Sequence, residues 1–323
     1  MDRLHARFGP NAEEIPLDMC PCGNRKATLR RFLVARKYNI DEAEMMIRDT
    51  LSWRLTVTVG NVQGVDNILR AKPRWDLLSE NRKMIPSTPF HCRSKQGFPV
   101  YLLRLGKGDG ALATTTSEEC HVYCSIIRGE HLTKVLIPAA QVLHTNRKDC
   151  SRQHLLSTKN NDNAKNASSK SGSDDDYILM DKQVVIVDLE GLGMSALRCL
   201  YVFKTINSVA AFNYPELSKA IYVVNSPPVF DYLWSVVKPL LAVHTQSKIR
   251  IFRSGARQYE ALQNILEDDD IPDYLTPQVE GKAPRGLTGT VTDATNPDFR
   301  PRGVVELDDW ILAQSRGEPL NST

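Results

Sequence analysis

Three short apolar runs decide the fold: QVVIVDLEG at residues 183–191, KAIYVVN at residues 219–225 and KIRIF at residues 248–252. Each run is almost continuously apolar, which is typical of strands that are buried on both faces. Between the runs, residues 195–212 and 229–241 are apolar at helical spacing. The order strand, helix, strand, helix, strand predicts a largely parallel sheet with right-handed crossovers, and therefore an α/β fold.

The first 80 residues predict a small helical subdomain. A helical pattern begins near Lys26 and stops near Asn39, and Asp41 is placed to cap the helix that follows.

Two further elements belong with the sheet. Residues 99–105 predict a strand after a turn, and residues 117–143 predict a helix. We therefore expect a second domain over residues 85–280. Within it, residues 157–176 contain no apolar residue larger than Ala and predict a disordered insertion. Residues 281–323 are rich in Gly, Pro and Thr, and we expect a flexible tail.

Composition excludes several classes of protein. Lys and Arg number 41 and Asp and Glu 38, so the net charge of +3 argues against a nucleic-acid-binding protein. No apolar run approaches the roughly 18 residues of a membrane span, and the N-terminus has no signal-peptide core. Seven cysteines in 323 residues are an odd and small number, which argues against a disulfide framework. We therefore expect the protein to reside in the reducing cytoplasm.

One glycine motif suggests an enzyme. Residues 191–196, GLGMSA, follow an apolar strand and open a helix, as in dinucleotide-binding proteins. That fingerprint also needs an acid at the end of the next strand, where this chain has Val224 and Asn225. We favour a Gly-rich turn, and a nucleotide-dependent oxidoreductase stays as the rival from another class.

The cysteines and histidines offer no complete catalytic or metal site. Cys120, His121 and Cys124 could form part of a metal site, but free cysteines usually pack a buried helix face, which we favour. The pair Cys20 and Cys22 has no second pair at metal-ligand spacing. We expect no cofactor, no metal and no catalysis, which favours a binding protein.

Two stretches carry residues that a simple core does not need. Arg36 falls within the apolar stripe of the helix near Lys26, where a buried cation needs an anionic partner unless its stem reaches the surface. Residues 229–241 are apolar over most of a helix surface. That helix is either a buried crossover or a cover over an apolar cavity that also touches membrane.

Six ordered motifs then resemble the CRAL-TRIO lipid-binding family, of the phosphatidylinositol transfer protein type. They extend from about residue 28 to residue 275. The matching stretches are LRRFLVARKY at 29–38 with WR at 53–54, GFPVY at 97–101, VDLEG at 187–191, NYPE at 213–216, VN at 224–225, and KP at 238–239 with TQSK at 245–248.

The resemblance implies a sheet floor with helices that enclose a hydrophobic lipid pocket. It also implies a headgroup site for phosphatidylinositol and a gate helix that opens against a bilayer. The headgroup residues carried over are Arg36, Lys37, Glu216, Thr245 and Lys248, and the gate residues are Phe230, Leu233, Trp234 and Val237. A phosphate diester would supply the anion that Arg36 needs, and a carboxylate suits inositol hydroxyls.

The function that we expect is binding of phosphatidylinositol and its transfer or presentation between membranes, without catalysis. The protein would be a cytoplasmic monomer that contacts membrane surfaces transiently and binds no nucleic acid. The alternative within the family is a carrier of a sterol, tocopherol or retinoid. Members that also carry phosphatidylcholine have Ser, Thr and Tyr where this chain has Gln183, Val185 and Phe90.

Overall fold

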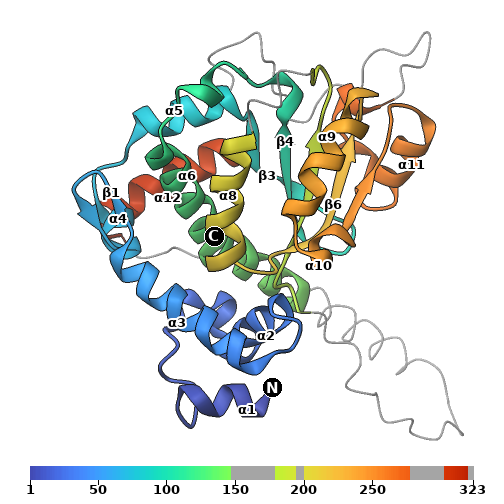
Figure 1. Cartoon of the computed structure of the whole chain (residues 1–323). Coiled ribbons are helices and arrows are strands. Elements are labelled where there is room, and N and C mark those ends of the chain that lie inside the picture. Colours follow the sequence, from blue (N-terminus) through green and yellow to red (C-terminus); the bar gives the residue numbers. More distant parts are fainter. Residues whose placement is uncertain (147–178, 194–199, 277–301, 319–323) are drawn as a thin grey trace, which may run out of the picture.

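A five-stranded sheet forms the centre of the computed structural model, which describes residues 1–146, 179–193, 200–276 and 302–318 (Figure 1). The strand order is β3-β4-β5-β6-β7, with β4 to β7 parallel and β3 antiparallel to β4. The bounds are β3 Ser87–Arg93, β4 Pro99–Arg104, β5 Gln183–Asp188, β6 Ser218–Val224 and β7 Ile249–Ile251. The three runs that decide the fold are therefore neighbouring parallel strands, and the predicted α/β class is confirmed.

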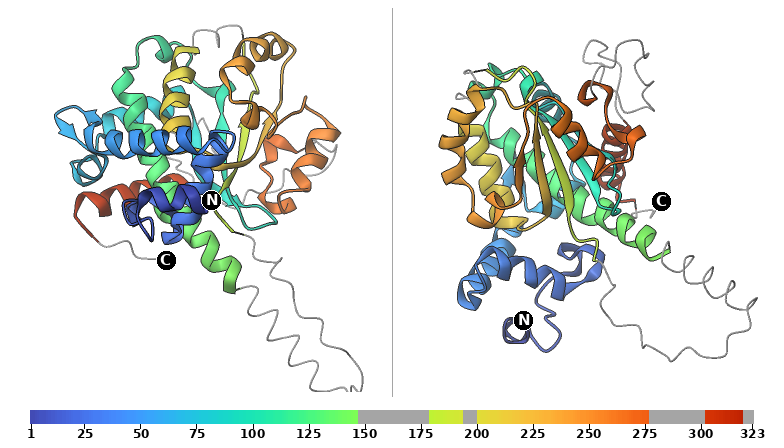
Figure 2. Two further views of the ribbon diagram at one scale, coloured as in Figure 1. Left: turned by 60° about the horizontal axis from the view of Figure 1, so that its bottom comes forward. Right: turned by 90° about the vertical axis from the view of Figure 1, so that its right-hand side faces the viewer.

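Helices cover both faces of this sheet (Figure 2, right). One face packs on α11, Ala256–Gln263, and on the segment after it, through a core that includes Val184, Ile186 and Leu262. The opposite face turns toward α6, Glu118–His131, where Arg128 Nη1 donates to the Tyr101 hydroxyl oxygen at 2.7 Å. On that side lie α8, Leu200–Asn213, and α9, Val229–Val237, which is followed by α10, Val243–Gln246.

The predicted helix over 117–143 is longer and less regular than expected. After α6 it continues through a π-helical turn, Leu132–Leu136, and stays helical to residue 146. The predicted helix over 195–212 is described from Leu200 as α8. Residues 194–199, the predicted insertion at 157–176 and residues 277–301 lie outside the described residues.

The N-terminal helices pack in two groups (Figure 1). The first group has its own core, with Phe8, Ile15 and Ile47 buried in it. Its helices are α1 Asp2–His5, α2 Arg25–Ala35 and α3 Ile40–Thr56. The second group joins the core of α6 and consists of the hairpin β1 Thr58–Val59 and β2 Val62–Gln63, with α4 Val65–Arg70 and α5 Trp75–Met84.

The cap of α3 differs from the prediction by two residues. Asn39, rather than Asp41, caps this helix, because the Asn39 side chain accepts from the backbone N–H groups of Asp41 and Glu42 at 3.1 and 3.2 Å. Asp41 then lies in the first turn, where its charge suits the positive end of the helix dipole.

The C-terminal segment corrects a second expectation. Residues 281–323 do not form a flexible tail throughout, because Arg302–Ser315 is helix α12. Leu307, Trp310 and Ile311 of α12 are buried in the core that α4, α5 and α6 share. The apolar face of α12 stabilises its position, although its sequence is separated from the domain by a Gly- and Pro-rich stretch.

Candidate functional site

Two of the five predicted headgroup residues, Glu216 and Lys248, lie just before neighbouring strands, and a third, Thr245, lies in the short helix before the second strand. Glu216 precedes β6 in a left-handed backbone conformation with a φ of 61°, and Lys248 directly precedes β7. Their side chains form an ion pair and are only 7% and 11% exposed. Thr245 is one turn before Lys248, in α10. The turn geometry of the loop before β6 thus aims the Glu216 carboxylate at Lys248.

A histidine joins this pair. His244 Nε2 lies 3.0 Å from Glu216 Oε2, although the His244 side chain is largely exposed. The Glu216 carboxylate therefore has two nitrogen partners, Lys248 from inside and His244 from the solvent side. The sequence showed His244 beside Thr245 but gave no reason to place its ring on Glu216.

Arg36 and Lys37 occupy the end of α2, apart from the pair. Arg36 is half-buried, and its guanidinium lies 5.5 Å from the centre of the exposed Phe212 ring at the end of α8. Lys37 is exposed and has a φ of 50°. Within the described ranges, no hydrogen bond or ion pair joins either residue to Glu216 or Lys248. Arg36 is thus not a deeply buried cation.

A further cation near the pair was missed. Lys182 is half-buried directly before β5, and Gln183 beside it donates its N–H to Leu217 O at 2.8 Å. Burial lowers the pKa of Lys182, and the positive charge of Lys248 lowers it further. The only sequence signal for Lys182 was its place at a strand start, which Lys248 shares.

The predicted gate helix α9 has one buried side and one exposed side. Leu233 is buried, whereas Phe230, Trp234 and Val237 are half-buried. The Phe230 and Trp234 rings are stacked with 6.1 Å between their centres. Apolar surface that the prediction did not name is also exposed here, at Tyr232, Leu240 and Val243.

The motif residues Arg54 and Tyr214 form a network with the buried Glu130 beside this site. Glu130 is 1% exposed and accepts from Arg54 Nη2 at 3.2 Å and from the Tyr214 hydroxyl at 2.7 Å. Burial opposes ionisation of Glu130, but Arg54 and Lys134 outweigh it and hold its pKa below the usual range. The network fixes Tyr214 and hence the loop that carries Glu216.

The acid at the end of β5 and the cysteines of the possible metal site have structural partners. Asp188 is fully buried at the end of β5, where it accepts from Arg104 Nε at 3.2 Å and from Asn225 Nδ2 at 2.8 Å. Cys120 and Cys124 are buried on α6 and contact the Leu77 carbonyl. In the part of the chain that the structure describes, no three His, Cys, Asp or Glu side chains are grouped as metal ligands.

Comparison with known proteins defines the class. Residues 174–276 match the model of the CRAL/TRIO domain, the family that the motifs resemble. In the described ranges, no helix combines the length and apolarity needed to span a bilayer.

Individual relatives are distant. The chain is 25% identical over 251 residues to the phosphatidylinositol/phosphatidylcholine transfer protein SFH11 of Arabidopsis thaliana, covering 77% of this chain and 56% of that protein. It is 26% identical over 261 residues to the protein real-time of Drosophila pseudoobscura pseudoobscura, covering 77% and 31%. The chain spans about a third to a half of the length of the curated relatives that it matches.

A solved structure supports the fold. The crystal structure of Sfh5 aligns over 95% of this chain and 85% of its own chain, with a TM-score of 0.50 and 15% sequence identity. The overall fold of this chain is thus similar to that of a protein of known structure.

Proposed function

We propose that this protein binds phosphatidylinositol and transfers or presents it between membranes without catalysis. The observation that carries the proposal is the nearly buried ion pair of Glu216 and Lys248 at the position that the resemblance assigns to the headgroup. A carboxylate accepts hydrogen bonds from inositol hydroxyls, and an ammonium binds a phosphate oxygen. The Arabidopsis relatives carry phosphatidylinositol in their names, which supports the same ligand.

The acyl chains would lie between the sheet and the helices that cover it. Val185 and Tyr101 are register partners on the face that turns toward α6, and α9 lies on the same side. Burial contributes about 0.8 kcal/mol per CH₂ group, so two acyl chains supply most of the affinity. Exchange then requires α9 to move, and its exposed apolar residues Tyr232, Leu240 and Val243 would contact the bilayer while it does.

The charges at the strand starts favour an anionic headgroup. Lys182 and Lys248 lie near one another, with the carboxylates of Asp181 and Glu216 close to Lys182 and Glu216 paired with Lys248. Arg36 at the end of α2 adds a third cation on the same side as Phe212. The protein would act at cytoplasmic membrane surfaces, as a monomer that binds them transiently.

Lipid extraction followed by mass spectrometry of the purified protein is the direct test. The full chain would be produced in eukaryotic cells, and phosphatidylinositol is expected as the main co-purifying lipid. Transfer of labelled phosphatidylinositol between liposomes would then show exchange. A sterol, tocopherol or retinoid as the main ligand would replace the headgroup assignment while leaving the carrier role intact, and a bound nucleotide would contradict both.

A further inference from the structure

Arg31 is a buried cation that forms no ion pair within the described part of the chain. It lies in α2, is 6% exposed, and has no hydrogen-bond partner for Nε or Nη1. Its remaining nitrogen, Nη2, donates to Thr28 Oγ1 at 3.3 Å. Buried guanidinium groups in folded proteins normally pair with an anion, because leaving the charge unpaired is costly. Arg31 therefore needs an anionic partner that the described residues do not provide.

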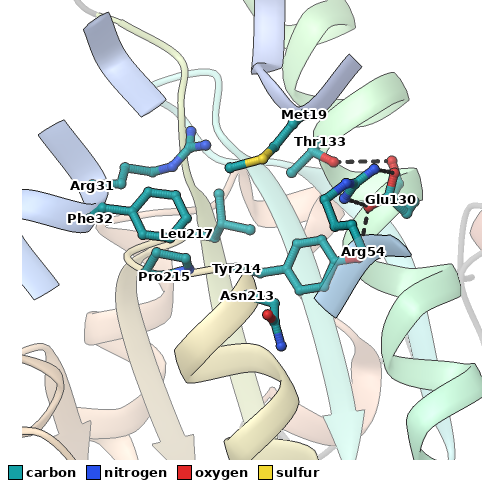
Figure 3. Close-up of a pocket in the computed structure, with 10 residues that line it drawn as sticks. All are labelled: Met19, Arg31, Phe32, Arg54, Glu130, Thr133, Asn213, Tyr214, Pro215 and Leu217. Atoms are coloured by element: carbon teal, nitrogen blue, oxygen red, sulfur yellow. Dashed lines mark hydrogen bonds and ion pairs between the residues drawn. The ribbon is translucent and has the colours of Figure 1, made fainter. Parts of the chain in front are cut away.

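A cleft adjoins Arg31, between the N-terminal helices and the sheet domain (Figure 3). The space that the cleft encloses is small, about 10 Å³, and the rest of it is open to solvent. The cleft therefore suits a small ion held at its mouth and not a two-chain lipid. Its lining residues are Met19, Arg31, Phe32, Arg54, Glu130, Thr133, Asn213, Tyr214, Pro215 and Leu217.

The other charges of the lining are already paired. Arg54 and Glu130 form an ion pair with each other, and the Tyr214 hydroxyl donates to Glu130. The Thr133 hydroxyl donates to the Gly129 carbonyl at 2.8 Å. Among the lining residues, all of which the structure describes, Arg31 is thus the charged group left for a ligand, and the lining has a net charge of one positive.

Asp181 does not neutralise Arg31. Burial lowers the pKa of Arg31, and the negative charge of Asp181 opposes that effect from nearby. Yet no ion pair within 4.0 Å joins the two among the described residues. The carboxylate reduces the positive potential of the cleft without occupying the guanidinium.

We propose that the cleft is a binding site for a phosphate-class oxyanion, free or as a phosphate ester, with Arg31 as its charged anchor. Guanidinium groups match the geometry and charge of such oxyanions. Pro215 and Leu217 of the lining flank Glu216, so an ester bound to the headgroup residues would lie close by. The bound anion would link α2 to the loop before β6 and stabilise the docking of the N-terminal helices.

The site is distinct from the pair of Glu216 and Lys248, so it stands even if the lipid assignment fails. The test is the melting temperature of the full chain in sodium phosphate and in sodium chloride of equal ionic strength. Phosphate also stabilises proteins generally, and therefore the comparison is between Arg31→Gln and Arg30→Gln, which changes an exposed neighbour outside the cleft. We expect phosphate to raise the melting temperature of the wild type and of Arg30→Gln well beyond its effect on Arg31→Gln.

Calorimetric titration with inorganic phosphate and with inositol 1-phosphate measures the affinity of the cleft for each anion and shows which kind of anion it prefers. Arg31→Gln should weaken binding by about tenfold or more, the scale of a charge-assisted hydrogen bond. If the natural occupant is a lipid headgroup, protein loaded with phosphatidylinositol from liposomes should no longer bind inorganic phosphate. If the occupant is a free anion, the loaded protein should still bind it. Equal responses of wild type and Arg31→Gln would overturn the site.

A second variant keeps the test informative if Arg31→Gln does not fold. Asp181→Asn removes the nearby carboxylate and leaves the guanidinium in place, so we expect tighter phosphate binding. If Asp181 is instead the true partner of Arg31, the same change lowers the melting temperature in chloride and produces no gain in phosphate affinity. That result would also overturn the proposal.

Discussion

Glu216 and Lys248 are 32 residues apart in the sequence, and their ion pair joins the starts of the neighbouring strands β6 and β7. The pair exists because parallel strands start at one edge of the sheet, which brings the residues before them together. His244 covers the pair from solvent. A ligand that enters must therefore offer hydrogen-bond donors to Glu216 and an anion to Lys248, which an inositol phosphate does.

The first prediction concerns the headgroup residues. Lys248→Ala or Arg36→Ala should weaken phosphatidylinositol binding by about 1.5–3 kcal/mol, because each removes a charge-assisted hydrogen bond to the lipid. Transfer of labelled lipid between liposomes measures the effect. Lys238→Ala is the matched control, since Lys238 is an exposed cation at the end of α9. Wild-type transfer by folded Arg36→Ala and Lys248→Ala would refute the assignment.

The second prediction concerns the stability of the fold at acidic pH. Burial lowers the pKa of His131 to about 4, well below the 6.5 of a free histidine, so the folded state keeps this ring neutral. The unfolded state binds the proton first, and stability is therefore lost as the pH falls from about 6.5 to about 4. The loss due to His131 is about 3 kcal/mol, at 1.36 kcal/mol for each pKa unit.

Urea unfolding at pH 7 and at pH 4.5 measures this dependence. His131→Phe is the control variant, because it keeps an aromatic ring against Trp310, whose ring centre is 5.2 Å from that of His131. The difference in stability between the two pH values should shrink by most of the predicted amount in this variant. An unchanged difference would show that other groups cause the acid sensitivity.

The third prediction concerns α12. Trp310 is buried between α12 and α6, so Trp310→Ala should lower the free energy of unfolding by about 3–5 kcal/mol, the usual cost of such a cavity. Val305→Ala on the exposed side of α12 is the control and should cost far less. Urea denaturation compares the two. Similar small losses would indicate that α12 does not pack as described.

The predictable part of the fold was the part encoded locally. Continuous apolar runs identified β5, β6 and β7 because strands buried on both faces need them. β3 was missed because Ser87–Arg93 contains Pro89 and polar residues, which an edge strand tolerates. α12 was missed because a long Gly- and Pro-rich stretch before it suggested a tail, and only the tertiary contacts of Trp310 show its partner.

The site was less predictable, because its partners are distant in sequence. The motifs placed Glu216 and Lys248 in one site, whereas nothing local to Arg54 indicated Glu130 as its partner. Arg30 and Arg31 are adjacent cations on one helix, and the sequence did not distinguish them. The structure exposes Arg30 and buries Arg31, whereas Arg36, for which burial and a stem that reaches the surface were both open, is half-buried.

The fourth prediction concerns the gate. Phe230→Asp should slow lipid transfer more than it lowers the amount of lipid bound, because it puts a charge on the side of α9 that carries the Phe230 and Trp234 rings. Ser235→Asp adds the same charge at an exposed position of the same helix and is the control. Liposome flotation and transfer measure both steps. Wild-type transfer by Phe230→Asp would make α9 a simple crossover helix.

The last prediction concerns ligand range. Relatives in Arabidopsis are named for both phosphatidylinositol and phosphatidylcholine, but this chain has Val185 and Phe90 where the dual-ligand pattern has Thr and Tyr. Val185 offers no hydrogen bond to a phosphate. Phe90 lies in β3, two strands from β5, and belongs to a cluster with Leu136 and Leu217. We therefore expect preference for phosphatidylinositol, with phosphatidylcholine weaker by about tenfold or more.

A gain of function tests this preference more sharply than a loss. Val185→Thr restores a hydroxyl with almost the same shape on the same face of β5, so it should raise phosphatidylcholine transfer and leave phosphatidylinositol transfer nearly unchanged. Val184→Thr is the control, because the side chains of successive strand residues point to opposite faces and Val184 packs in the core on the α11 side. Both lipids would be labelled and supplied at equal mole fraction. Equal transfer of the two lipids by the wild type would contradict the preference, and the headgroup assignment for phosphatidylinositol would still depend only on Glu216, Lys248 and Arg36.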